Sequence, residues 1–350
     1  MQTIRLALIG FGNVGQGLAQ ILYDKSNTYA DKFGLKFIII AVTDLIYGSA
    51  YDPEGLDLPT LLKVASEHGN LSQLPSQGNH WDAFTTISNS NADVIVEISY
   101  TNFETAEPAL SHIRAAFENH KHVVTSNKGP IALKYQELID LAHTKNVKLG
   151  VEGTVMSGTP VLNLGIKQLA GTEIHQIEGI LNGTTNYILT KMGNGASYAD
   201  ALAEAQAQGY AEADPTGDVE GYDTAGKLVI LSSTILNTPL NIKQVERVGI
   251  TNITENEIEQ ARQNICKWKL IGTLEKQAQA VRASVKPICL PQSHPLANVD
   301  GATNAITFNT DLLGQVTLIG PGAGRMETGY AIICDLLGIY RQEYAFRSNL

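Results

Sequence analysis

The chain has 350 residues, of which 43% are apolar and 17% charged, a composition typical of a globular protein long enough for two domains and a large core. Its formal net charge of −10 argues against nucleic acids and anionic membranes as partners, because both are polyanions. Small anionic ligands stay compatible with this charge, since they need only a local positive site.

Cysteine usage and the N-terminal residues point to the cytoplasm. Cys266, Cys289 and Cys334 lie far apart and form no C-x-x-C, so we expect reduced thiols rather than a disulfide scaffold or a zinc cluster. The first residues, MQTIRLALIG, run straight into a strand pattern, and we expect no cleavable signal peptide. The longest apolar runs, FIIIAV and LVILSSTIL, are too short to span a bilayer.

A glycine-rich motif follows the first apolar run. Residues 4–10 (IRLALIG) are typical of a buried strand, and apolar residues recur at helical spacing after residue 13. Between them lies a G-x-G-x-x-G, the fingerprint of a dinucleotide-binding turn, in which the helix N-terminus offers N–H groups to a pyrophosphate. Its residues are Gly10, Phe11, Gly12, Asn13, Val14 and Gly15.

The second predicted strand, residues 35–44 (LKFIIIAVTD), ends in an acid. Asp44 stands where a carboxylate would meet the adenosine ribose hydroxyls, although it can equally cap a turn. A long first helix followed by the polar connection SNTYADKFG accounts for the distance from the glycines. Because no Arg or Lys follows closely, a 2′-phosphate has no obvious counter-charge, and we predict NAD in preference to NADP.

Further strands and helices alternate up to residue 153. Strands are predicted at 92–99, 121–126 and 147–153, with helices at 104–120 and 132–146. This alternation predicts a parallel, doubly wound α/β sheet whose ligands gather at the C-terminal strand ends. The residues expected there are Ser99, Tyr100, Thr101, Asn102, Ser126, Asn127, Lys128 and Gly129, with Lys128 on a loop.

Beyond residue 150 the pattern changes. The segment VEGTVMSGTPVLNLGIKQLAG is a turn of small residues followed by a helix, and the backbone carbonyls of the turn, with Glu152 nearby, could hold a hard cation. A plain turn is the alternative. Residues 175–192 predict a strand, the polar turn NGTTN and a helix, and residues 197–209 predict a helix that ends at Gly209.

The stretch GYAEADPTGDVEGYDTAGKLVI, residues 209–230, gathers five carboxylates around Lys227. Residues 214–221 are predicted to be a loop, and an apolar helix follows in which Asp223 and Lys227 form an i, i+4 pair. Because the rest of the helix is apolar, we expect the pair to enter the interior, where a lysine needs partners. Such a lysine is suited to proton handling, although an exposed salt bridge is the simpler alternative.

The pattern A-x3-GYA-x2-DP-x2-DV-x-G-x-D-x3-K at 205–227 resembles the signature of homoserine dehydrogenases. TSNKGP, VEGTVMSGTP, GILNGTTNYIL and GPGAGRMETGYAIICDL also resemble that family, in the expected order, so the resemblance runs from residue 4 to about 340. It implies reversible NAD(P)H-dependent reduction of L-aspartate 4-semialdehyde to L-homoserine, a step toward threonine and methionine. The chain stops near residue 350, so we expect no regulatory ACT extension.

The resemblance also assigns roles by position. Lys227 resembles the catalytic lysine and Asp223 the acid that orients it, and Lys128 is expected beside nicotinamide and substrate. The substrate's amino-acid end would be held by Glu212, Asp218 and Thr184. A sodium ion would be bound by Glu152 and carbonyls of Val155, Ser157 and Thr159. Cofactor contacts would include Ser99, where many relatives have Thr, then Tyr100 and Gly324.

We therefore predict three parts: a Rossmann-type dinucleotide-binding domain at 1–150, an α+β substrate and dimerisation domain at 151–318, and a segment at 319–350 that returns to the first domain. The resemblance suggests a homodimer. Another two-domain oxidoreductase on a small carbonyl substrate and a non-catalytic NAD(P) sensor stay open as alternatives. Glyceraldehyde-phosphate-type chemistry would need a nucleophilic cysteine at the head of the second domain, where the sequence has none.

Overall fold

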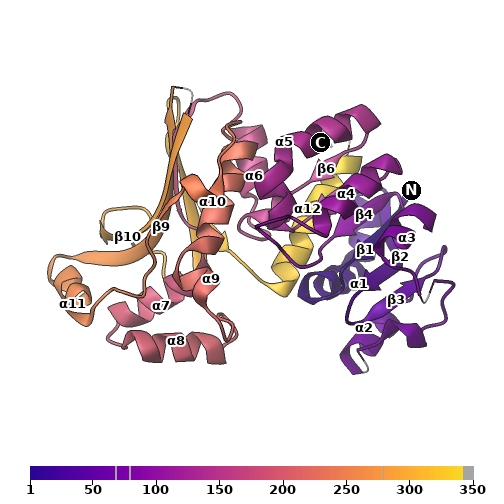
Figure 1. Ribbon diagram of the computed structural model, residues 1–350, viewed down its shortest axis with the longest axis horizontal. Helices are drawn as coiled ribbons and strands as arrows, with labels where there is room; N and C mark the ends of the chain where they lie inside the picture. The colour runs from indigo at the N-terminus through magenta and orange to yellow at the C-terminus, as the bar shows by residue number, and fades with distance from the viewer. Residues whose placement is uncertain (68, 79, 279, 342–350) are drawn as a thin grey trace. The chain divides into compact units, whose positions relative to one another are not determined.

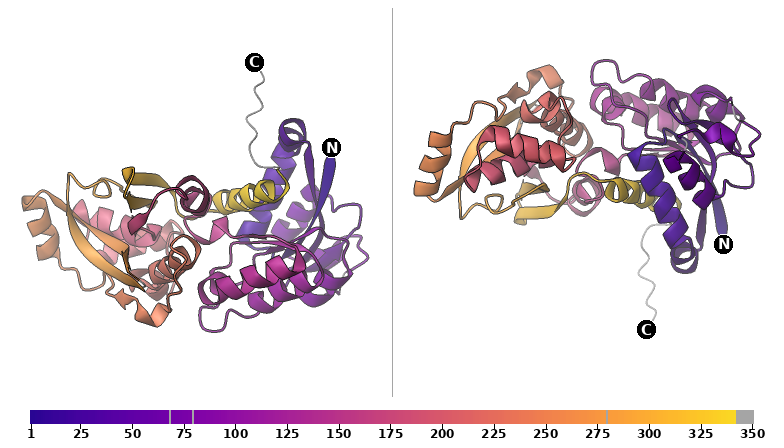
Figure 2. Two further views of the ribbon diagram at one scale, coloured as in Figure 1. Left: turned by 90° about the horizontal axis from the view of Figure 1, so that it is seen from above. Right: turned by 90° about the horizontal axis from the view of Figure 1, so that it is seen from below.

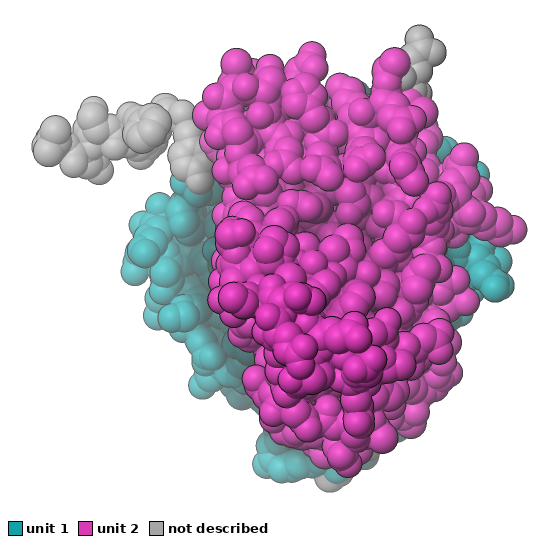
Figure 3. Space-filling view, turned by 90° about the vertical axis from the view of Figure 1, so that its left-hand side faces the viewer, with its two compact units in different colours: residues 1–154, 324–350 teal, residues 155–323 magenta. Residues whose placement is uncertain are grey.

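The computed structural model describes residues 1–341 except 68, 79 and 279, and the chain forms two compact units (Figures 1 and 3). Unit 1 comprises Met1–Thr154 and the chain from Gly324 onward, and unit 2 comprises Val155–Ala323. Residues 342–350, the end of the predicted C-terminal segment, lie outside the described part. Within that part, no helix is long and apolar enough to cross a lipid bilayer.

Unit 1 is built on a six-stranded sheet in the order β3-β2-β1-β4-β5-β6. All neighbouring strands are parallel except the edge pair β2 and β3, which is antiparallel. This order confirms the predicted doubly wound α/β sheet, and the antiparallel edge strand is an addition to it. The strands are β1 (Gln2–Ile9), β2 (Leu35–Asp44), β3 (Gly48–Tyr51), β4 (Val94–Glu97), β5 (His122–Thr125) and β6 (Leu149–Gly150).

Apolar side chains from the helices and strands of unit 1 form one core, in which the central strands are buried. The final helix lies beside the first, so the end of the chain completes this unit (Figures 1 and 2). The helices are α1 (Asn13–Phe33), α2 (Leu58–Glu67), η1 (Leu71–Gln73), α3 (Ala83–Asn89), α4 (Ala109–Glu118), α5 (Lys128–Lys145), η2 (Glu152–Thr154) and α12 (Arg325–Tyr340).

Several predicted boundaries in unit 1 were wrong. The strand predicted at 147–153 is only Leu149–Gly150, followed by the helical turn η2, and the helix predicted at 132–146 begins at residue 128. The expected connection SNTYADKFG belongs almost wholly to α1, which ends at Phe33. Gly34 caps the helix in a left-handed conformation, and its N–H donates a hydrogen bond to Ala30 O. Helix α4 starts at Ala109 rather than residue 104, because Pro108 interrupts the pattern. Lys128 is not on a loop: it is the first residue of α5, directly after the N-cap Asn127.

Unit 2 contains a second six-stranded sheet, in the order β12-β11-β7-β9-β10-β8. Its neighbouring strands are antiparallel except β10 and β8. Helices α7 and α10 pack against its central strands (Figure 1), which agrees with the predicted α+β class. The strands are β7 (Ile174–Ile180), β8 (Glu246–Arg247), β9 (Cys266–Gln277), β10 (Ala280–Pro291), β11 (Thr303–Thr310) and β12 (Gly314–Pro321).

The helices of unit 2 differ from the predicted ones at two places. The helix after Pro160 is short and continues as a π-helical turn, η3, and the predicted loop at 214–221 contains the helix α9. The helical segments are α6 (Val161–Asn163), η3 (Leu164–Gln168), α7 (Gly183–Gly193), α8 (Tyr198–Ala207), α9 (Thr216–Val219), α10 (Tyr222–Thr234), η4 (Ile242–Gln244) and α11 (Glu255–Gln263).

Candidate active site

The glycine-rich turn joins β1 to α1 in unit 1. Gly10 has φ +105°, and a Cβ there would lie 2.5 Å from Ile98 O on the neighbouring chain segment, so the turn requires glycine. A Cβ on Gly15 would lie 3.0 Å from Gly10 O, which makes this the close helix–strand contact. Gly12 is the N-cap of α1, and a Cβ built on it would have no atom within 4 Å, so the space beside it is open. With no side-chain cap, the first N–H groups of α1 stay available to an anion.

Asp44 ties the end of β2 to this turn. Its Oδ2 accepts a hydrogen bond from Phe11 N at 2.7 Å, and its Oδ1 accepts bonds from Ile46 N at 2.8 Å and Tyr47 N at 3.0 Å. The carboxylate therefore caps the turn into β3, one of the two roles considered from the sequence. Contact with a ribose stays a prediction.

The ends of β4 and β5 are joined by Asn127. Its Nδ2 donates to Ser99 O at 3.1 Å and Tyr100 O at 2.9 Å, while its Oδ1 accepts from Gly129 N at the start of α5. Ser99 and Lys128 are half-buried and Tyr100 is exposed. The predicted cofactor residues of these two strands thus lie on one edge of the sheet, the C-terminal edge.

Glu97, the last residue of β4, was missed by the sequence reasoning. It is fully buried, its Oε1 accepts from Ser99 Oγ and lies 3.3 Å from His112 Nδ1, and its Oε2 has no partner among the described residues. Thr125 Oγ1 also donates to its backbone carbonyl at 2.7 Å. A carboxylate that ends an otherwise apolar strand (VIVE) is a sequence signal that would have found it.

Lys227 lies in the interior of unit 2, paired as its spacing predicts. It is 5% exposed, its Nζ lies 2.7 Å from Asp223 Oδ2, and it donates to Leu181 O at 2.5 Å. Gly221, with φ +78°, turns the chain into α10, and most of that helix is buried. Two of the three ammonium N–H groups are thus used within the described part of the chain, which leaves one for a ligand oxygen.

Asn182 connects the acids of this site and was not predicted. It caps α7 by accepting from Thr185 N at 2.9 Å, and its Nδ2 donates to Asp218 Oδ1 at 2.6 Å and Asp223 Oδ2 at 3.1 Å. The polar turn NGTTN, with Asn at an N-cap position, carried the signal. Burial and, less strongly, the neighbouring Asp223 raise the pKa of Asp218, against the hydrogen bonds from Asn182 and Thr184.

The structure brings Asp218, Asp223, Lys227 and Thr184 together in unit 2. Thr184 is buried and donates to Tyr210 O at 2.5 Å. Glu212 lies on the exposed segment after α8, where its backbone carbonyl accepts from Gln206 Nε2 at 3.0 Å. A substrate contact through Glu212 stays a prediction.

The residues predicted to bind a cation lie where the chain passes from unit 1 to unit 2. In unit 1, Glu152 is buried and its N–H donates to Asp335 Oδ2 at 2.9 Å. In unit 2, Met156 and Ser157 have φ of +52° and +54°, which is costly for residues with side chains, and Thr159 Oγ1 donates to Pro321 O. The described residues form no cluster of His, Cys, Asp and Glu suited to a metal, so a cation here would depend mainly on backbone carbonyls.

Gly324 begins the final helix of unit 1. It has φ +143° and is the N-cap of α12, which crosses α1 where both helices carry glycine. A Cβ on Gly17 would lie 2.1 Å from Arg325 O, and one on Gly329 would lie 2.8 Å from Leu18 N. The late motif GPGAGRMETGY thus positions a helix against the one that follows the nucleotide-binding turn.

Comparisons with known proteins agree over nearly the whole chain. A family model described as homoserine dehydrogenase matches residues 160–337, and one described as homoserine dehydrogenase, NAD binding domain, matches residues 10–152. An NAD(+)-dependent homoserine dehydrogenase of Pseudomonas canavaninivorans is 45% identical over 344 residues, with 97% of each chain covered. A homoserine dehydrogenase of Methanocaldococcus jannaschii is 43% identical, over 96% of this chain and 98% of that one.

Solved structures show the same relationship. A candidate homoserine dehydrogenase from Archaeoglobus fulgidus aligns with a TM-score of 0.87 at 36% identity, covering 97% of this chain and 100% of that one. A hyperthermophilic archaeal homoserine dehydrogenase in complex with NADPH aligns with a TM-score of 0.83 at 30% identity, covering 97% and 98%.

Proposed function

The chain belongs to the homoserine dehydrogenase family of NAD(P)-dependent oxidoreductases, and we propose that it reduces L-aspartate 4-semialdehyde reversibly to L-homoserine with Lys227 acting on the substrate oxygen. The observation that carries this proposal is the buried ammonium of Lys227, held by Asp223 and Leu181 O with one N–H left over. A small amino-acid substrate fits this site, because the Lys227 ammonium can bind its reacting oxygen and the carboxylates can bind its ammonium group.

The nicotinamide cofactor supplies or accepts the hydride. The uncapped N-terminus of α1 and the open space beside Gly12 fit a pyrophosphate, and Asp44, Ser99, Tyr100 and Lys128 would complete the cofactor contacts. We propose NAD(H) as the preferred form, because Asp44 rather than a basic residue ends β2.

Lys227 handles the charge that develops on the substrate. During reduction, negative charge grows on the aldehyde oxygen, and a preorganised ammonium stabilises that oxygen and delivers a proton to it, directly or through water. Asp223 keeps the ammonium in place. It orients rather than transfers the proton, because a carboxylate paired with lysine is a very weak base.

The remaining acids recognise the amino-acid end of the substrate. Asp218 accepts from Asn182 and lies near Asp223, so its carboxylate is placed to accept hydrogen bonds from the substrate ammonium. Thr184 and Glu212 complete this set in the proposal. Glu212 is exposed, so its carboxylate is accessible to a ligand.

Several finer expectations stay predictions. We propose a sodium ion on Glu152 and the carbonyls of Val155, Ser157 and Thr159, for which the two left-handed residues in that loop are the structural support. We also propose a nucleotide-binding role for residues 1–150, a substrate and dimerisation role for residues 151–318 with a homodimer as the assembly, and a cytoplasmic location.

An NADH oxidation assay tests the proposed function. Purified protein, L-aspartate 4-semialdehyde and NADH should lose NADH absorbance and form homoserine, and NADPH should support a lower kcat/KM than NADH. A protein that binds NADH without turnover would instead be a sensor. If the protein oxidises NADH only with other carbonyl compounds, it is an NADH-dependent reductase with a different substrate.

A further inference from the structure

A cavity lies in unit 2 among residues that take no part in the proposed reaction. It has a volume of about 200 Å³ and lies between the C-terminal end of α7, helix α11 and the start of β9. Its lining includes none of Asn182, Asp218, Asp223 and Lys227. The charged members of the lining are Arg262, Lys267, Lys269 and Asp300.

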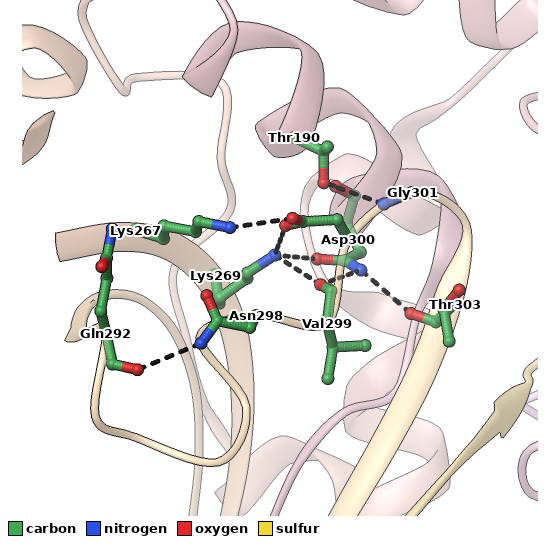
Figure 4. Close-up of polar contacts among 10 residues, drawn as sticks. Thr190, Lys267, Lys269, Gln292, Asn298, Val299, Asp300, Gly301 and Thr303 are labelled. Carbon is green, nitrogen blue, oxygen red and sulfur yellow. Dashed lines mark hydrogen bonds and ion pairs between the residues drawn. The ribbon is translucent and has the colours of Figure 1, made fainter.

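A buried lysine fixes one wall of the cavity (Figure 4). Lys269 is 1% exposed, and its Nζ donates to Val299 O at 2.6 Å, Asn186 Oδ1 at 3.0 Å and Asp300 Oδ1 at 3.0 Å. Thr190 Oγ1 accepts from Gly301 N at 3.1 Å and joins α7 to the same loop. These bonds use every N–H group of Lys269, so its role is to hold the 299–301 loop in place.

Two further cations border the same space and keep unused donors. Lys267 Nζ lies 2.8 Å from Asp300 Oδ2, and Figure 4 shows Lys267 and Lys269 converging on that carboxylate. Arg262 donates through Nε to Gly193 O at 2.8 Å, through Nη1 to Glu259 Oε2 at 3.1 Å and through Nη2 to Met192 O at 3.4 Å. Because an ammonium has three N–H groups and a guanidinium five, both retain donors toward a ligand within the described part of the chain.

The formal charge of the lining is positive in an acidic protein. Arg262, Lys267 and Lys269 outnumber Asp300, which gives +3 − 1 = +2, whereas the whole chain carries −10. A local excess of this sign attracts small anions and would not retain cations. Arginine and lysine side chains are the groups that bind carboxylates and phosphates in proteins.

The rest of the lining is apolar and restricts the ligand further. The indole of Trp268 is held by a hydrogen bond from Nε1 to Glu257 O at 3.2 Å. Aliphatic side chains also line the cavity. The aliphatic members of the lining are Leu189, Ile258, Ala261 and Ile265. Bound inorganic phosphate would leave these apolar side chains exposed to water, whereas an anion with an apolar body would remove them from water. The volume is below the roughly 300–1,000 Å³ of sites for drug-sized ligands.

We propose that this cavity is a second binding site, which takes a small monocarboxylate with a short aliphatic body. The carboxylate binds Lys267 and Arg262 at the rim, and the aliphatic body lies against Trp268 and the α7–α11 wall. The proposal does not depend on the assignment of the reaction site, because none of its residues belongs to that site.

Trp268 allows the site to be observed directly. The chain has two tryptophans, Trp81 and Trp268, so a Trp81→Phe protein reports emission from the cavity alone. We expect 4-methylpentanoate to change this emission saturably. Its uncharged amide and inorganic phosphate should each bind at least about tenfold more weakly, the amide because it lacks the charge-assisted bonds and phosphate because it lacks the apolar body.

A matched pair of lysine variants in the same background tests the role assigned to Lys267. Lys267→Gln should raise the Kd for 4-methylpentanoate on the order of tenfold. Lys286→Gln is the control, because Lys286 has similar side-chain exposure (39% against 35%) and a carboxylate partner, Glu246, but lies outside the cavity lining. An absent or non-saturable signal, equal binding of acid and amide, tighter binding of phosphate, or an unchanged Kd in Lys267→Gln would each overturn the proposal.

Discussion

Asn182 shows how one uncharged side chain can organise a charged site. It caps α7 and donates to two carboxylates that would otherwise repel each other beside Lys227. We expect Asn182→Ala to lower kcat/KM on the order of tenfold, since hydrogen bonds to charged groups contribute roughly 1.5–3 kcal/mol. Loss of the cap should also lower the free energy of unfolding by about 1 kcal/mol. Steady-state kinetics and urea unfolding measure the two effects separately.

Ser197→Ala is the matched control, because Ser197 caps the next helix, α8, by accepting from Asp200 N at 3.1 Å and lies outside the site. It should lose similar stability and keep its kcat/KM. If Asn182→Ala behaves in the same way as this control, Asn182 is only a cap.

The raised pKa of Asp218 gives a pH-dependent prediction for stability. A carboxyl group whose pKa is higher in the folded protein stabilises the fold below its ordinary pKa, and this contribution is lost as pH rises through the folded value. Asp218→Asn should therefore increase the free energy of unfolding at about pH 7.5, and the gain should shrink at about pH 4.5. Urea unfolding at both pH values measures the difference.

Asp214→Asn provides a control of opposite sign on the same segment. Hydrogen bonds from Thr216 lower the pKa of Asp214, so its carboxylate stabilises the fold above its ordinary pKa and loses that effect as pH falls. This variant should be less stable than the parent at about pH 7.5. A gain in both variants, or in neither, would show that the environment assigned to Asp218 is incorrect.

At the level of single residues, spacing along the chain predicted the central pair of the site. Asp223 and Lys227 are paired and buried, as an i, i+4 pair in an apolar helix requires. Asn182 and Glu97 were missed although each carried a local signal, and only the fold shows the contacts of Asn182 with Asp218 and of Glu97 with His112. Glu212 lies in the same acidic stretch as Asp218, but only the fold shows that it is exposed.

Among the elements, the crossing of α1 and α12 depends on glycine. Because a Cβ on Gly17 would meet a backbone oxygen of Arg325, Gly17→Ala should force the helices apart and destabilise unit 1 by roughly 1–3 kcal/mol. Gly193→Ala in α7 is the control, since open space surrounds that Cβ position, and alanine should leave stability unchanged or raise it by up to about 1 kcal/mol. Equal stabilities in urea unfolding would contradict this helix contact.

The elements with strong periodicity were predicted well and the irregular ones were not. Strand β2 has the predicted bounds, because a buried apolar run between Gly34 and a polar turn leaves little choice. No element was predicted between Asp44 and residue 92, where the structure has β3, α2, η1 and α3. Short elements such as β3 and α9 are stabilised by tertiary contacts more than by local pattern.

For the whole molecule, the acidic net charge is compatible with local positive sites such as the cavity beside Lys267. The return of the chain through α12 to unit 1 was anticipated only through family resemblance. Composition and periodicity do not determine which earlier helix a final helix will contact.

The most direct test of the proposed reaction is the turnover of Lys227→Ala with L-aspartate 4-semialdehyde and NADH, measured together with NADH affinity. Loss of the ammonium should lower kcat at least about a hundredfold and leave the Kd for NADH unchanged. Lys191→Ala is the control, because it removes another carboxylate-paired lysine of unit 2, bound to Glu204 at 2.6 Å, and should keep near-normal kcat. Near-normal kcat in Lys227→Ala would contradict the role of Lys227 at the substrate oxygen.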